Sequence, residues 1–349
     1  MSLEALNSPP LVGALTVGCY GLLPIAASNP ALVTSLPFAA IKGINLLSYG
    51  FSVYSVGRPG RYDGAAAVTE TSSSSNNNNK TKESSSSPAM SEGARRGMEQ
   101  MSPSKGRTLV PPAGWAFAIW GPIFLGELFM VVAPWFGPVS PRAEWILREI
   151  SGPYALAQAF QALWAASFRP KYGSRGGAYK YVSVANLAGI AAALSLCHGA
   201  FSGAGGCGCS ALEYGLYCLP LAMHFGWTTA AAIVNANGMY ALAGANSGEE
   251  DSPGAARSVA VLGHASVLAA TAIGISVAWT RDAPVYGGVV VWALAAVASG
   301  LKQRIAGAES VKRRGGAAAV GIYGAERQRV LSLSGAAVCA LAVAAVVLK

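Results

Sequence analysis

Glu127 is the single carboxylate in an apolar run, residues 111–135, that is otherwise rich in aromatic residues and proline. A carboxylate inside a membrane-length apolar segment is costly, so it usually faces a partner or a cavity. Lys42 is a lone base at a similar depth in the preceding apolar run. This similarity predicts an ion pair between Lys42 and Glu127. The alternative is a purely structural pair that fixes the register of two helices.

Aromatic side chains precede this carboxylate, namely Trp115, Phe117, Trp120 and Phe124. The last three share one face at helical spacing, and Glu127 continues that face one turn on. Pro112 and Pro122 loosen the helix, which lets side chains and freed carbonyl groups line a cavity. The alternative is an interfacial aromatic belt with ordinary core packing, above all for Trp115, which is expected near the membrane surface.

A second polar face lies further along the chain, at His224, Thr228, Ala231 and Asn235. Their spacing places them on one side of a helix. Such a stripe inside a membrane span either hydrogen-bonds a neighbouring helix or lines a ligand site. His224 and His264 are isolated from other ligand types, so buried, hydrogen-bonded side chains are expected there rather than haem or metal ligands.

Enzymatic motifs are absent from the sequence, which has no Gly-x-Ser-x-Gly, no nucleotide-binding loop and no His-rich metal box. Glu127, Asp282 and the histidines offer no evident acid–base pair. We therefore expect a non-enzymatic protein, and the sequence identifies no cofactor.

Cysteines gather in one stretch, at Cys197, Cys207, Cys209 and Cys218. If this stretch faces an oxidising compartment, Cys207 or Cys209 could pair with Cys197 or Cys218. Metal capture is a second reading, although the spacing lacks a recognised zinc pattern. A Gly-rich loop with unpaired thiols is the third.

The composition identifies the elements that position these residues. Of 349 residues, 52 % are hydrophobic and 12 % charged, and the mean hydropathy is +0.40, which indicates an all-α multi-pass membrane protein. A span needs about 20 apolar residues. Eight are expected, at residues 31–56, 112–135, 152–168, 179–202, 213–243, 257–279, 285–306 and 330–348, with a ninth if residues 11–28 insert.

The positions of the charges support this order of spans. We call the side that carries residues 57–108 side X and the opposite side Y. With the expected spans, most of the 25 Lys and Arg residues fall on side X, as the positive-inside rule requires of a cytoplasmic or equivalent face. These residues orient the helices and meet anionic lipid headgroups. The net charge of +9 therefore does not indicate nucleic-acid binding.

Composition also divides the chain into four parts. Residues 1–56 form an apolar N-terminal part, and residues 57–108, with their Ser and Asn tracts, are expected to be a disordered linker. Residues 109–245 hold the core spans, and residues 246–349 hold three more. No basic region precedes the first apolar run, so the N-terminus does not resemble a targeting peptide and the organelle stays undetermined.

Several segments resemble the tryptophan-rich sensory protein or translocator protein (TspO/MBR) family, in particular its longer relatives. The segment from Pro111 to Phe124, Pro-Pro-Ala-Gly-Trp-Ala-Phe-Ala-Ile-Trp-Gly-Pro-Ile-Phe, is similar to the second helix of that family. Gln161-x-x-Trp164-x-x-x-Phe168 is similar to its Asn-x-x-Trp-x-x-x-Phe, with Gln in place of Asn. Trp227, Ala231 and Asn235 follow the spacing of its last helix, and the segment from Asp282 to Trp292 also looks like the longer relatives.

The resemblance implies a five-helix unit that binds or senses a flat hydrophobic ligand such as a porphyrin or sterol. The ligand-binding residues so expected are Trp115, Phe117, Trp120, Phe124, Glu127, Trp164, His224, Trp227, Thr228 and Asn235. Phe117 and Trp120 are one residue closer than in the compact members, which have only five helices. Transport of a small molecule or lipid is the alternative function, although no inverted repeat is visible in the sequence. Membrane lipids, and a second copy of the chain in a homo-oligomer, are further expected partners.

Overall fold

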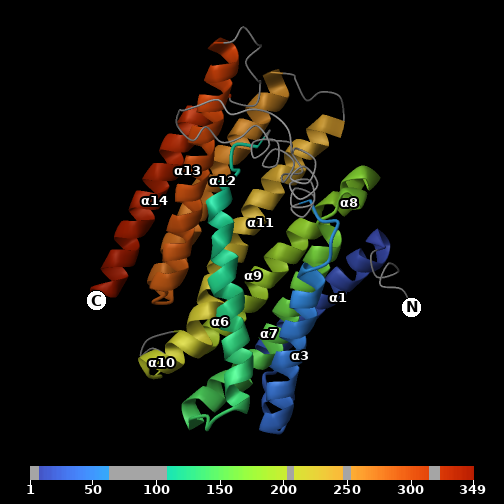
Figure 1. The fold of residues 1–349 in the computed structure, drawn as a ribbon, viewed down its shortest axis with the longest axis vertical. Helices are drawn as coiled ribbons and strands as arrows, with labels where there is room; N and C mark the ends of the chain where they lie inside the picture. The colour runs from blue at the N-terminus through green and yellow to red at the C-terminus, as the bar shows by residue number, and fades with distance from the viewer. Residues whose placement is uncertain (1–7, 63–107, 203–207, 247–252, 314–322) are drawn as a thin grey trace, which may run out of the picture.

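The structure, a computed structural model, describes residues 8–62, 108–202, 208–246, 253–313 and 323–349. Within these ranges every regular element is a helix, as expected for an all-α membrane protein. Nine long helices run roughly alongside one another (Figure 1). They are α1 (Pro9–Ser28), α3 (Phe38–Val56), α6 (Trp120–Val132), α7 (Pro141–Ser167), α9 (Val182–Phe201), α11 (Leu219–Asn246), α12 (Pro253–Thr280), α13 (Pro284–Arg313) and α14 (Ala325–Val347).

Short helical turns join or extend the long helices. They are α2 (Ala31–Thr34), α8 (Pro170–Arg175), α10 (Ala211–Glu213), the 3₁₀ turns η2 (Gly114–Ile119), η3 (Ala133–Trp135) and η4 (Gly177–Tyr181), and the π-helical turn η5 (Tyr214–Cys218). The turns η2 and η3 extend α6 at its two ends, so the segment Gly114–Trp135 covers 22 residues.

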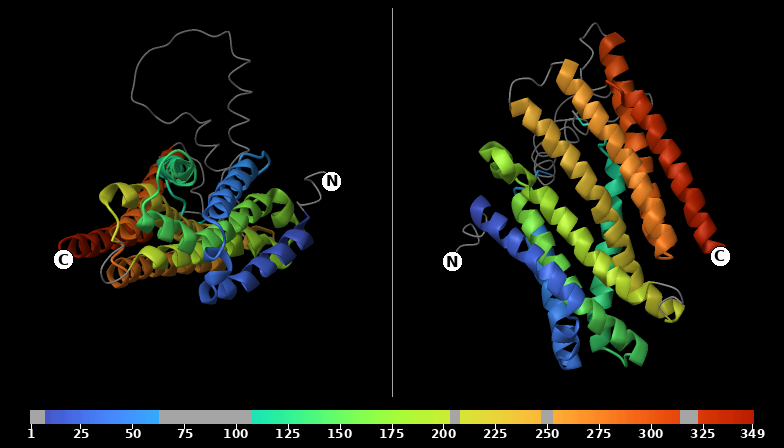
Figure 2. Two further views of the ribbon diagram at one scale, coloured as in Figure 1. Left: turned by 90° about the horizontal axis from the view of Figure 1, so that it is seen from below. Right: turned by 180° about the vertical axis from the view of Figure 1, so that it is seen from behind.

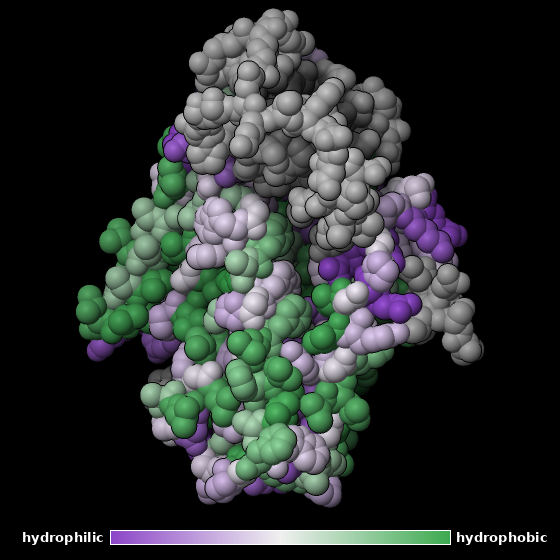
Figure 3. All heavy atoms as spheres, viewed as in Figure 1, coloured by the Kyte–Doolittle hydropathy of each residue, from purple (hydrophilic) through white to green (hydrophobic). Residues whose placement is uncertain are grey.

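Seven helical segments in the described part are long and apolar enough to cross a membrane. They include α1, the segment whose insertion the sequence left open, and exclude α3 and α7. These two helices are less apolar, because α3 carries Lys42 and Asn45 and α7 begins with several charged residues. Both nevertheless pack against other long helices, α3 against α6 and α7, and α7 also against α9 and α1 (Figure 1). Hydrophobic residues cover much of the face formed by the long helices (Figure 3).

Two element boundaries differ from expectation. The expected span 31–56 is divided, because the chain leaves helical geometry at Pro37 before α3 begins. The helix α7 begins at Pro141 rather than near residue 152, and Pro153 lies inside it. Its charged first turns are satisfied locally, since Arg148 pairs with Glu144 at 2.7 Å and donates to the carbonyl groups of Thr34 and Leu36.

Five helices form a closed ring, in which each helix contacts the next in the order α3, α6, α11, α9, α7 and back to α3. This is the expected five-helix unit. Small residues permit close contact within it: a Cβ on Gly189 of α9 would lie about 2.5 Å from the ring of Phe160 on α7. Glu127, His224 and Thr228, three of the polar residues that the sequence singled out, are fully buried within the ring.

Outside the ring, α12, α13 and α14 pack on one another and reach the ring chiefly through α11. On the other side, α1 packs against α7 and α9, so that α1 and α14 lie at opposite edges of the molecule (Figure 2). The division of the chain into four parts stays a prediction. Most of the expected linker, residues 63–107, lies outside the described residues.

Candidate functional site

The segment that carries the aromatic face begins as an extended chain and becomes helical in two steps. Pro111 and Pro112 precede the 3₁₀ turn η2, and α6 follows without a break at Trp120. Residues three apart align in a 3₁₀ turn and residues three or four apart align in an α-helix. Phe117, Trp120 and Glu127 therefore stay on one side although the helix type changes between them.

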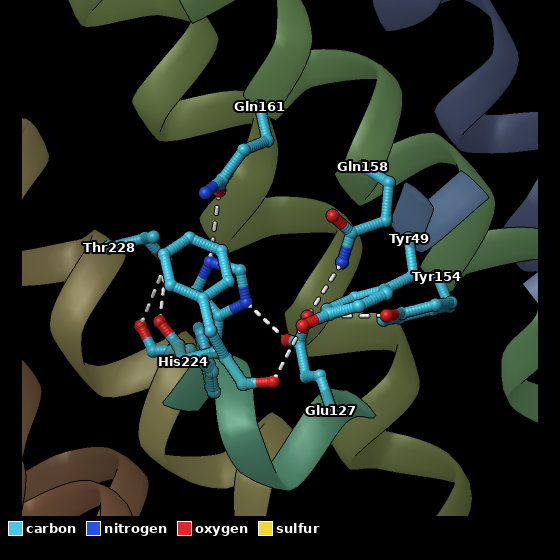
Figure 4. A network of polar contacts seen from close by, with 9 residues as sticks. Tyr49, Glu127, Tyr154, Gln158, Gln161, His224 and Thr228 are labelled. Carbon is cyan, nitrogen blue, oxygen red and sulfur yellow. Dashed lines mark hydrogen bonds and ion pairs between the residues drawn. The ribbon is translucent and has the colours of Figure 1, made fainter. Parts of the chain in front are cut away.

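Glu127 is fully buried and all of its hydrogen-bond partners come from neighbouring helices. Its Oε1 lies 2.6 Å from Nδ1 of His224 on α11, and its Oε2 accepts from Gln158 at 2.9 Å and from Tyr154 at 3.2 Å, both on α7 (Figure 4). Beside it, the hydroxyl of Tyr49 on α3 donates to the Phe124 carbonyl at 2.8 Å. Helices α6, α7 and α11 thus meet at this carboxylate, and α3 bonds the backbone of α6 next to it.

His224 is also fully buried, and both of its ring nitrogens face oxygen atoms. Its Nε2 lies 3.1 Å from Oε1 of Gln161, opposite the contact of Nδ1 with Glu127 (Figure 4). Both ring nitrogens are therefore engaged by side chains of neighbouring helices, α6 on one side and α7 on the other. A polar group inside a membrane bundle is tolerated when it is paired in this way.

The expected ion pair between Lys42 and Glu127 is wrong. The Lys42 ammonium donates to the carbonyl of Pro134 at 3.3 Å and lies 4.6 Å from the ring centre of Trp135. The Lys42 ammonium therefore lies at the Y end of α6, and the carboxylate of Glu127 contacts His224 in its place. The two acid–base residues that seemed scattered in the sequence, Glu127 and His224, are in direct contact.

Aromatic rings form a wall next to this pair. Trp120 stacks on Phe124 at 5.1 Å between ring centres, and it meets His224 edge-on at 5.6 Å. Trp227, one turn beyond His224 on α11, meets Trp120 at 6.2 Å and Phe117 at 5.8 Å, again edge-on. The contacts join α6 to α11 from the start of the aromatic face to the level of the buried pair.

The polar residues on one face of α11 have partners of two kinds, within their own helix and on a neighbouring helix. Thr228 is buried and its hydroxyl donates to the carbonyl of His224 at 2.8 Å, one turn back in the same helix. Asn235 donates to the hydroxyl of Ser183 on α9 at 3.0 Å. Of this stripe, His224 faces the aromatic wall, whereas Asn235 bonds a neighbouring helix.

Two tryptophans of the predicted ligand-binding set, Trp115 and Trp164, contact residues outside the aromatic wall. Trp115 meets Trp292 of α13 edge-on at 4.6 Å and its indole nitrogen donates to Ser299 at 3.4 Å. Trp164 stacks on Phe168 at 5.6 Å, under the guanidinium of Arg61. Neither ring has a contact with Trp120 among the ring pairs of the described residues, so the predicted set does not form a single cluster.

Three buried polar atoms in and beside this centre have no hydrogen-bond partner among the described residues: Oε1 of Gln158, Nε2 of Gln161 and Nε1 of Trp227. Buried polar atoms are bonded in the great majority of cases. One acceptor and two donors are therefore open to a bound molecule or to water, next to the pair formed by Glu127 and His224.

Sequence reasoning missed Tyr49, Tyr154 and Gln158. A usable signal existed on α7, because Tyr154, Gln158 and Gln161 are spaced by four and three residues and so share one face. All three residues lie within the expected span 152–168, so this signal was available from the sequence. Tyr49 had no comparable signal.

Of the three readings of the cysteine stretch, the disulfide from Cys207 or Cys209 to Cys197 or Cys218 is wrong, because Cys197 and Cys218 are buried free thiols. Cys209 is disulfide-bonded, but to neither of these two residues. Cys207 itself lies outside the described residues. In the described part, no three His, Cys, Asp or Glu side chains come close enough together to hold a metal ion. His264 instead bonds Gln328 of α14.

The fold and this centre define an integral, multi-pass, all-α membrane protein with a buried Glu127–His224 pair and an aromatic wall inside a ring of five helices. The chain matches the TSPO-like protein family over residues 92–348, and it belongs to that family. The match begins after α3 and extends through α12, α13 and α14. No curated protein and no solved structure gave a significant match.

Proposed function

We propose that this protein binds a flat hydrophobic ligand with polar groups at its edge, such as a porphyrin or a sterol, without catalysing a reaction. The observation that carries the proposal is the set of open polar atoms on Gln158, Gln161 and Trp227 beside the aromatic wall. An apolar site with a few convergent polar groups is the usual form of a small-molecule site. Its family, TSPO-like proteins, points in the same direction.

The ligand would reach the site from the membrane along the aromatic face. Trp115 and Phe117 expose 41 % and 45 % of their surfaces at the X end of this face, while Trp227 is buried behind them. A flat ring system would stack on Trp120 and Phe124 and direct its polar edge to Gln158 and Gln161. The small cavity between α11, α12 and α13, lined by residues such as Ile233, Val267 and Val290, is no candidate for this ligand. It has a volume of about 30 Å³, against several hundred for a drug-sized molecule.

Glu127 and His224 would act as the polar floor of the site. The carboxylate already accepts hydrogen bonds from Gln158 and Tyr154 and contacts His224, so its oxygens are engaged by side chains of the protein itself. Its role in the proposal is to hold Gln158 and the imidazole in place, and the imidazole in turn holds Gln161. This is why binding, rather than catalysis, is proposed.

The test is a titration of the purified full chain with protoporphyrin and, separately, with a fluorescent sterol, following tryptophan fluorescence. We expect saturable quenching in the wild type and a weaker response in Trp120→Phe. The matched control is Trp145→Phe, which removes a tryptophan near the Y end of α7, and it should keep the wild-type binding curve. If neither ligand gives saturable quenching in the wild type, the proposal is wrong.

A further inference from the structure

The X end of α3 is tied to the end of α7 by an arginine. The guanidinium of Arg169 donates through Nη1 to the carbonyl of Pro59 at 2.8 Å and through Nε to the carbonyl of Ala165 at 3.2 Å. In the opposite direction, the amide of Tyr62 donates to the carbonyl of Phe168 at 3.1 Å. Arg169 is therefore held in one position by backbone groups and not by a carboxylate.

Gly60 is needed for this arrangement. Its φ of +95° is a left-handed conformation that favours glycine, and a Cβ at this position would lie 2.8 Å from Nη1 of Arg169. The tight turn brings Arg58 and Arg61 next to Arg169. Burial, followed by the positive charges of Arg61 and Arg58, lowers the pKa of the Arg169 guanidinium.

Neither Arg58 nor Arg169 forms an ion pair with a carboxylate among the described residues. The cation of Arg58 instead lies 5.6 Å from the ring centre of Tyr54. A ring face beneath a guanidinium leaves its N–H edge open, and that edge matches the oxygens of a phosphate group. Hydrophilic residues gather at this end of α3 and around α8 (Figure 3). Two guanidiniums at the X end of α3 thus have no carboxylate partner among the described residues.

An apolar stripe runs from this cluster into the membrane. Leu47, Phe51 and Tyr54 lie on one face of α3, spaced by four and three residues, and they expose 74 %, 54 % and 49 % of their surfaces. Arg58 continues the same spacing and stacks on Tyr54. A phospholipid would fill both features, because its negatively charged headgroup fits the basic cluster and its acyl chain fits the apolar stripe. A free phosphate ion would make no contact with the stripe.

We propose that an anionic phospholipid binds at the X end of α3, with its phosphate on Arg58 and Arg169 and an acyl chain along Tyr54, Phe51 and Leu47. Juxtamembrane basic clusters on this side of a membrane attract anionic headgroups. This site is separate from the pair formed by Glu127 and His224 and does not depend on the proposed ligand. It would fix the end of α3, one wall of the five-helix ring, at the membrane surface.

The experiment is native mass spectrometry of the purified full chain, titrated with phosphatidylglycerol or with phosphatidylcholine of the same acyl chains. We expect preferential retention of phosphatidylglycerol. In Arg58→Gln its apparent affinity should fall about fivefold, the effect of one basic residue at a lipid surface. Arg175→Gln is the matched control, because it removes the same charge from α8 at the same end of the protein, and it should bind as the wild type does.

Phe51→Ala, which leaves every arginine in place, should weaken binding of both lipids by shortening the apolar stripe. Equal retention of the two lipids by the wild type would overturn the proposal, and so would equal losses in Arg58→Gln and Arg175→Gln. Glycerol phosphate, a headgroup without acyl chains, should not compete. Effective competition by it would show an anion site in place of a lipid site.

Discussion

The carboxylate of Glu127 on α6 lies 2.6 Å from Nδ1 of His224 on α11, with both side chains fully buried. The two residues are far apart in the sequence, and their contact closes the ring of five helices on the side of α6. Tyr154, Gln158 and Gln161 of α7 complete the hydrogen bonding around them. The centre therefore couples three helices through one buried polar pair.

Removing one member of this pair should be destabilising. Glu127→Gln replaces the carboxylate that contacts His224, Gln158 and Tyr154, and a buried polar group left without its partner costs about 1–3 kcal/mol. His224→Gln should cost a similar amount. In the double variant that carries both Glu127→Gln and His224→Gln, the two losses in the free energy of unfolding should not add. The coupling free energy should be about 1–3 kcal/mol. Reversible unfolding in mixed detergent micelles measures all three variants.

Lys42 provides the control for this cycle. It contacts Pro134 and Trp135 and not Glu127, so Lys42→Gln and Glu127→Gln should be additive within about 0.5 kcal/mol. A large coupling between residues 42 and 127, or none between Glu127 and His224, would contradict the geometry described above.

The two candidate partners of Glu127 show how far the sequence reaches. Counting residues along a span gives depth in the membrane, and Lys42 and Glu127 have similar depths. Depth does not show which helices are neighbours or which way each side chain turns. The contact of α6 with α11 brings His224 to the carboxylate, whereas Lys42 turns to the end of α6. The aromatic face, by contrast, follows from local spacing and was predictable.

Helix α7 shows the same limit for an element boundary. Pro153 and the charges before it predict a break, because proline removes a backbone donor and charges are costly in a membrane. The charge of Arg148 is instead satisfied by Glu144 and by carbonyl groups at the end of α2. Such partners come from tertiary structure and leave no local pattern.

The close contact between α13 and the start of the aromatic segment makes a prediction about Gly300. A Cβ on Gly300 would collide with the carbonyl oxygen of Pro111 and lie 3.0 Å from the amide nitrogen of Ala113. Ala113 also donates to the Ala296 carbonyl at 2.9 Å, so the two segments cannot separate without loss. Gly300→Ala should destabilise the protein by about 1–3 kcal/mol.

Gly288→Ala is the matched control in the same helix, because nothing lies within 4 Å of its added Cβ. It should change stability by no more than about 1 kcal/mol, and in the stabilising direction if it changes at all. Thermal unfolding of the two variants in detergent separates them. Equal unfolding midpoints of Gly300→Ala and Gly288→Ala would mean that α13 is not in close contact with the aromatic segment at Gly300.

Trp292 should hold the 3₁₀ turn η2 in place. Its indole nitrogen donates to the Ala116 carbonyl at 3.1 Å and its ring packs edge-on against Trp115. Trp292→Phe keeps an aromatic ring but loses the hydrogen bond, which is worth about 1 kcal/mol. We expect faster amide hydrogen exchange in a peptide covering residues 108–119. Trp279→Phe, an exposed tryptophan of α12, should leave that exchange unchanged, and a null result for Trp292→Phe would remove this role.

Cys197 and Cys218 should be unreactive in the folded protein. Both are buried free thiols, and Cys197 lies against the Ile150 carbonyl at 3.8 Å on the inner side of α9. A maleimide reacts with exposed thiolate, so neither residue should be labelled in mild detergent and both should be labelled after denaturation. Peptide mapping without reduction provides the second readout. A peptide that joins Cys197 or Cys218 to any other cysteine would contradict the structure, as would rapid labelling of either thiol before denaturation.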